Sequence, residues 1–89
     1  RFMHWMRSLD SVPTIRSLRD RVETLREIEM ADAQRRLANG EDPEQVLEHF
    51  TRNLSRKFAH APSQALKQAG QEGNAHLIST ARRLFKLTP

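Results

Sequence analysis

The stretch from Val12 to Leu37 constrains the fold of this chain more than any other, because its aliphatic residues recur with a helical period. Four of them follow alternating steps of three and four, which places them on one stripe of a helix: Ile15, Leu18, Val22 and Leu25. Pro13 and Thr14 suit the first turn of this helix, and Gly40 suits its C-terminal cap. The sequence therefore predicts a helix from about Thr14 to Asn39.

The length of this helix sets a packing problem. About 26 residues at about 1.5 Å each span about 39 Å. A compact domain of 89 residues has a radius of gyration of roughly 12 Å, and so a diameter of about 30 Å. The helix is expected to overhang its own domain, and a second copy of the chain would supply the missing surface.

Composition points to a thin core in a chain of one domain's size. Only 37% of the residues are hydrophobic, and a small domain buries a smaller share of its surface than a large one. The chain has no cysteine, which excludes disulfides and thiolate chemistry and fits a cytoplasmic protein. It also has no apolar run long enough to span a membrane.

Turn and cap residues divide the chain into five expected helices. Arg1–Asp10 is expected to be the tail of a helix that begins upstream, ending before Pro13. A third helix is expected from the Asp42 cap to about His60, because Pro62 follows. A short fourth helix should stop at Gly70, and Asn74 should cap the last one. The expected fold is an all-α bundle of about five helices, one of them long.

The sequence offers no candidate residues for catalysis or metal binding. The histidines lack the spacing of a helical zinc site, so surface or cap positions are expected for them: His4, His49, His60 and His76. Glu23 and Glu27 share a helix face, but neighbouring arginines favour solvated ion pairs. Gly70–Gly73 matches the GXXG loop of KH domains, yet two glycines at a helix end explain it without a ligand.

Positive charge gathers in the C-terminal part. Residues 51–89 contain seven Lys and Arg and one acidic residue. Residues 1–50 contain eight Lys and Arg and ten acidic residues. Two clusters lie close to single helix faces: Arg52, Arg56 and Lys57, and then Arg82, Arg83 and Lys86. They indicate either a surface that contacts nucleic-acid phosphates or a plain solvated face.

An ordered set of short motifs resembles the C-terminal dimerisation domain of glutamyl-tRNA reductases over nearly the whole chain. It comprises Val12-Pro13-Thr14-Ile15 with Leu18-Arg19, Glu23, Ile28-Glu29, Asp42-Pro43-Glu44 with Val46-Leu47, Leu54 with Lys57, His60-Ala61-Pro62 with Leu66, and Arg82-Arg83-Leu84-Phe85. The resemblance implies that residues 1–10 end a spinal linker helix and that residues 11–89 form a helical dimerisation domain.

The same resemblance implies a parent enzyme that uses NADPH to reduce glutamyl-tRNA to glutamate 1-semialdehyde, for tetrapyrrole synthesis. Its catalytic and NADPH-binding domains would lie outside this chain, so no catalytic or cofactor-binding residue carries over. The leading hypothesis is a homodimerisation module whose interface includes Ile15, Leu18, Val22 and Leu25. The alternative is a tRNA-contacting module that uses the six basic residues of the two clusters. A binding assay at low and high salt would test the alternative.

Overall fold

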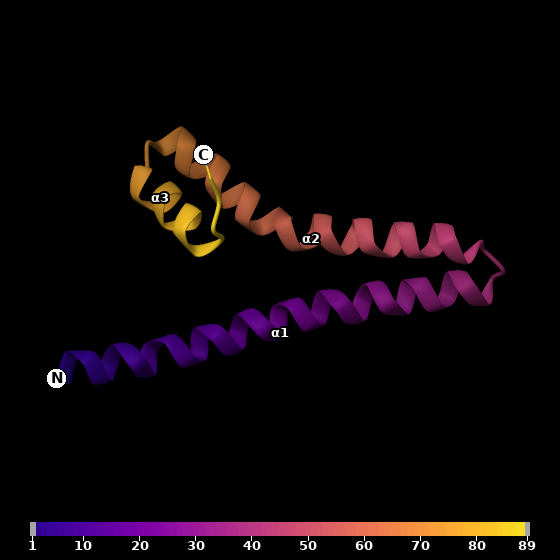
Figure 1. Ribbon diagram of the computed structural model, residues 1–89, viewed down its shortest axis with the longest axis horizontal. Coiled ribbons are helices and arrows are strands. Elements are labelled where there is room, and N and C mark those ends of the chain that lie inside the picture. Colours follow the sequence, from indigo (N-terminus) through magenta and orange to yellow (C-terminus); the bar gives the residue numbers. More distant parts are fainter. Residues whose placement is uncertain (1, 89) are drawn as a thin grey trace. The chain divides into compact units, whose positions relative to one another are not determined.

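Three helices make up the chain in a computed structural model, which describes the backbone of residues 2–88 and the side chains of residues 11–88. They are α1 (Phe2–Ala38), α2 (Pro43–Glu72) and α3 (Ala75–Leu84), and the described residues contain no strand (Figure 1). The expected all-α class is confirmed. The expected five helices, with a single long one, are wrong, because α1 has 37 residues and α2 has 30.

Two prolines lie inside helices where the sequence predicted breaks. Pro13 lies within α1, so residues expected to form two helices form one, and Pro62 does the same within α2. An interior proline loses one backbone hydrogen bond and strains the preceding turn. Breaking the helix would instead leave up to four N–H and four C=O groups without helical partners. No glycine lies near either proline to favour a turn, so continuing the helix is the better solution.

Both interhelix turns follow the Schellman pattern, with a glycine in the left-handed conformation. Gly40 (φ +84°) ends α1, and the N–H of Glu41 donates to the carbonyl of Arg36 at 3.1 Å. Gly73 (φ +72°) ends α2, and the N–H of Asn74 donates to the carbonyl of Ala69 at 2.8 Å. These bonds satisfy carbonyls that a helix end leaves free.

The cap at Gly40 was predicted correctly, but the stop expected at Gly70 is wrong. Gly70 lies in the last turn of α2, and the break comes three residues later. The starts of α2 and α3 agree with the sequence. An Asp42 carboxylate oxygen accepts from the Gln45 N–H at 3.1 Å, and the Asn74 side-chain oxygen accepts from the Leu77 N–H at 3.0 Å. Each satisfies an N–H at a helix start.

The chain divides into two compact units, Arg1–Ser55 and Arg56–Pro89, and the boundary falls within α2. In the first unit, the beginning of α2 runs antiparallel beside the end of α1 (Figure 1). The part of α2 in this unit is about 20 Å long, against about 55 Å for α1. Much of α1 therefore has no helical neighbour within its own unit, as the expected overhang requires.

The interior of the first unit is small. Among its residues with described side chains, Ala33 and Val46 are the buried apolar ones, and Glu29 is also buried, at 2% exposure. No buried side-chain nitrogen or oxygen among the described residues lacks a hydrogen-bond partner, and Glu29 has an interaction partner of its own. None of the large apolar side chains in the described region is fully buried. The expected thin core is confirmed.

The second unit has an equally small interior. It contains the rest of α2 and all of α3, which folds back beside the end of α2 (Figure 1). Ala69 of α2 is 2% exposed and Ala81 of α3 is 8% exposed. Small side chains at these positions let two helix backbones approach closely. The larger apolar residues of this unit, such as Phe58 and Phe85, stay partly exposed.

Candidate dimer interface

The apolar stripe of α1 is largely exposed to solvent. Ile15 is 49% exposed, Leu18 is 54% exposed and Val22 is 37% exposed, while Leu25 is half-buried. These are the four residues that the sequence predicted at an interface. One helix face carries them all, because their spacing follows the helical period. Their presence at a dimer interface stays a prediction.

Within the first unit, α2 accompanies α1 only as far as about Leu25. Asp32 of α1 lies opposite His49 of α2, with 3.7 Å between a carboxylate oxygen and the ring Nε2. In an antiparallel pair, each step forward on α2 is a step back on α1. The first unit ends six residues after His49, at Ser55, which corresponds to a point near Arg26. The stripe residues before that point face no helix of their own unit.

A second apolar surface lies where the α1–α2 hairpin closes, and we call it the hairpin pocket. Its volume is about 290 Å³. It is lined by Met30, Ala33, Gln34 and Leu37 of α1 and by Pro43, Val46, Leu47 and Phe50 of α2. Met30, Leu37 and Leu47 are exposed, the last at 63%. Sequence analysis did not identify this pocket, because it depends on the register between the two helices.

Polar contacts cluster around Asp32 and Arg36 near the closed end of the hairpin. Arg36 donates to Asp32 across one helical turn at 2.8 Å and to Glu41 of the loop at 3.2 Å. Hydrogen bonds from two arginines hold the pKa of the Asp32 carboxyl below its usual range. The bond from Arg36 has the larger effect, and the bond from Arg35 adds to it. The Asn53 amide lies 2.8 Å from His49 Nε2. The Arg36 contacts tie the loop to the end of α1, and Asp32 also lies opposite His49 of α2.

Ion pairs on the outer face of α1 join residues three or four positions apart. Asp32 and Arg36 pair as their spacing suggests. Glu23 pairs with Arg26, three residues on, whose Nε lies 3.1 Å from a Glu23 carboxylate oxygen. The hydrogen bond from Arg26 holds the pKa of Glu23 below its usual range. Since both side chains are half-exposed, this pair is a solvated surface contact and not a catalytic site.

The six basic residues of the predicted nucleic-acid surface are all exposed. Arg52 donates to Glu48 one turn earlier, which partly neutralises it. The other five belong to the second unit. Lys86 takes a left-handed conformation, φ +56°, at the end of α3. A role of Arg52, Arg56, Lys57, Arg82, Arg83 and Lys86 in tRNA contact stays a prediction.

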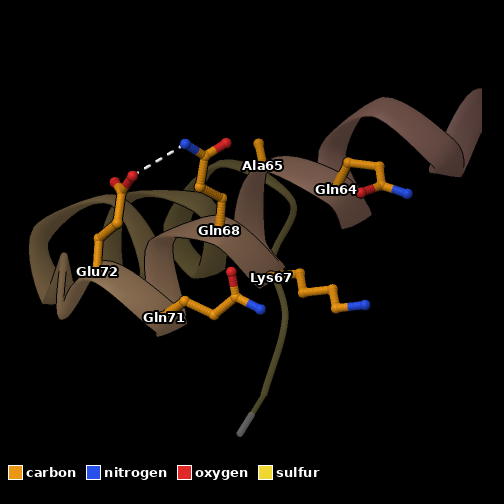
Figure 2. A pocket seen from close by; sticks show the side chains of 6 residues that line it. All are labelled: Gln64, Ala65, Lys67, Gln68, Gln71 and Glu72. Atoms are coloured by element: carbon orange, nitrogen blue, oxygen red, sulfur yellow. Dashed lines mark hydrogen bonds between the residues drawn. The ribbon is translucent and has the colours of Figure 1, made fainter.

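Two further pockets lie in the second unit. One, of about 480 Å³, is lined along α2 by Gln64, Ala65, Lys67, Gln68, Gln71 and Glu72. Figure 2 shows Gln68 turned toward Glu72, to which it donates at 2.9 Å, while Lys67 extends away from them. The other, of about 360 Å³, is lined by Phe58, Ala59, Pro62, Ser63, Leu66, Phe85 and Leu87. Neither pocket combines a nucleophile with a positioned base.

The described part of the chain has no candidate metal site and no candidate membrane-spanning helix. No three of its His, Asp or Glu side chains gather as they would around a metal ion. Among those same residues, no helix has the length and hydrophobicity required to cross a bilayer. The notable surfaces are therefore the α1 stripe and the pockets.

Comparison with known proteins identifies similar chains. The family described as glutamyl-tRNA(Glu) reductase, dimerisation domain, matches residues 1–87. A glutamyl-tRNA reductase of Nitrosomonas europaea is 46% identical over 86 residues, covering 97% of this chain and 21% of the relative. A glutamyl-tRNA reductase of Saccharophagus degradans is 47% identical over 81 residues, which cover 91% of this chain and 19% of that relative. The chain thus spans about a fifth of the length of these curated relatives. No solved structure matches it.

Proposed function

Because the chain belongs to the family of glutamyl-tRNA reductase dimerisation domains, we propose that it joins two reductase subunits through the exposed α1 stripe. The observation that carries this proposal is the row formed by Ile15, Leu18 and Val22, each between 37% and 54% exposed. An exposed apolar row on a long helix marks a surface that another protein covers.

The size of the hydrophobic contribution supports an interface of this kind. Burying the exposed half of an aliphatic side chain contributes about 1 kcal/mol. Four stripe residues on each of two copies give roughly 8 kcal/mol, which is similar to the cost of bringing two proteins together. Burial of the stripe can thus offset the free-energy cost of association. A tight dimer needs further buried surface beside the stripe.

The activity of the whole protein is a proposal drawn from the relatives. Those proteins are called glutamyl-tRNA reductases, and we assign the same substrate to the parent of this chain, with NADPH as reductant and the cytoplasm as its compartment. We assign no catalytic or nucleotide-binding residue to this chain. The role of this chain in that enzyme would be assembly.

A charge placed on the stripe tests the proposed interface. Leu18→Glu puts a carboxylate among the partner's apolar side chains, so we expect the dimer to dissociate. Ser17→Glu is the matched control, because Ser17 is exposed, lies one residue away on another helix face and receives the same charge. Sedimentation equilibrium measures both masses. A dimer that persists unchanged in Leu18→Glu would remove Leu18 from the interface.

A further inference from the structure

Two exposed apolar surfaces of the first unit have matching lengths. The first is the overhang of α1, Ser11–Thr24, which carries Ile15, Leu18 and Val22. The second is the hairpin, in which α2 lies beside α1 from about Leu25 to Ala38 and forms the hairpin pocket. Each segment of α1 has about 14 residues and so a length of about 21 Å. The overhang of one copy therefore fits along the hairpin of another.

A two-fold axis near Arg26 brings these surfaces together twice. In an antiparallel pair about that axis, Ile15 of one copy lies at the level of Leu37 of the other, and Val22 at the level of Met30. Leu18 then reaches the level of Gln34, where Leu47 of α2 lines the hairpin pocket. The closed symmetry makes every contact occur twice. All of the exposed apolar residues named here gain a partner in one arrangement.

The net charges of the two surfaces are complementary. The overhang carries three arginines against two acidic residues. Residues 25–55, which form the hairpin, carry four arginines against seven acidic residues. Pairing the overhang with the hairpin brings opposite net charges together, whereas pairing two overhangs brings together charges of the same sign. Charge complementarity of this kind selects one docking mode over another.

We infer that the hairpin pocket of each copy receives the α1 overhang of the second copy, with Leu18 against the partner's Leu47. This inference rests on the proposed dimerisation. It places the α1 stripe of one copy in the hairpin pocket of the other, and not against the partner's own α1 stripe. It also supplies the extra buried surface that the stripe alone lacks.

Disulfide cross-linking tests the arrangement, because the chain has no cysteine of its own. Leu18→Cys and Leu47→Cys are introduced separately and together, and both side chains are more than half exposed, so the helices should tolerate the change. Within one copy, these positions are about 24 Å apart along the hairpin axis. A disulfide requires Cα atoms within about 7 Å, so only two different copies can form it.

The expected result is a covalent dimer from the double variant and little from either single variant. Mixing the two single variants should also give the covalent dimer. The control is Ser17→Cys combined with Leu47→Cys, which places the thiol at the same height on another face and should link poorly. Far-UV circular dichroism checks that every variant keeps its helices.

Two results would overturn the inference in distinguishable ways. Efficient linking of Leu18→Cys to itself, or a non-covalent dimer without any Leu18-to-Leu47 link, would leave dimerisation standing and reject the overhang-to-pocket contact. A monomeric mass for the unmodified chain at every concentration would reject the proposed dimerisation as well.

Discussion

Individual residues at the helix ends account for the turns of this chain. Gly40 and Gly73 both adopt left-handed conformations, which cost most side chains about 1 kcal/mol or more. Gly70, three residues before Gly73, lies in the helix without a positive φ. No neighbouring atom lies within 4 Å of the position that a Cβ would occupy at any of these glycines. The three glycines therefore differ in their backbone conformation and not in the space around them.

This difference predicts opposite effects of one substitution at two neighbouring glycines. Gly70→Ala should stabilise the fold by about 0.5 to 1 kcal/mol, because alanine restricts the unfolded chain and favours helix. Gly73→Ala should destabilise it by about 1 kcal/mol, because alanine must adopt a left-handed conformation. Urea unfolding of the two variants measures both changes. Equal effects at the two positions would contradict the placement of the α2 cap at Gly73.

The Asp32 carboxylate predicts a pH dependence of stability. Its pKa is lowered by hydrogen bonds, first from Arg36 and then from Arg35. The folded state therefore binds this proton less readily than the unfolded state, in which an aspartate titrates at about 3.9. The stabilisation is fully present above that value and is lost as the pH falls through the lower folded-state pKa.

Comparison of the natural chain with Asp32→Asn measures this contribution. The stability advantage of the natural chain at pH 7 should shrink as the solution is acidified below about pH 4, because protonation removes the carboxylate. Thermal unfolding at a series of pH values gives the difference. An advantage that stays constant throughout the acid range would show that the Asp32 charge does not stabilise the fold.

At the scale of elements, the sequence predicted helix ends better than helix continuity. Asp42, Asn74 and Gly40 each mark an end through their own local chemistry, so they could be identified without knowledge of the fold. Pro13 and Pro62 were misread as breaks, because their effect depends on the whole helix around them. A helix continues through a proline when a break would leave more backbone groups without partners.

Alanine substitution tests the two continuous helices. Pro13→Ala restores an interior N–H at an exposed position, so it should raise the stability, by up to about 3 kcal/mol. Pro62→Ala should give a smaller gain, because Pro62 also lines an apolar pocket with Leu66 and Phe85. Thermal unfolding followed by circular dichroism measures both. If Pro13 instead began a new helix, its replacement would be neutral or destabilising.

The whole molecule is a set of helices with more apolar surface than its own units cover. The α1 stripe could be predicted from sequence, because it follows from the spacing of residues on one helix. The hairpin pocket could not, because Met30 and Leu47 come together only once the register of α1 and α2 is known. The same dependence explains why the sequence predicted a dimer and the α1 stripe as one of its surfaces, without predicting the surface that the stripe meets.

Association of two copies is the central claim, and the solution mass of this chain across a dilution series tests it most directly. Sedimentation equilibrium should give twice the 10.3 kDa of the single chain at high concentration. Dilution should shift the mass toward that of one chain, as it does for any reversible dimer. A mass of 10.3 kDa at every concentration would contradict the claim that these helices join two copies.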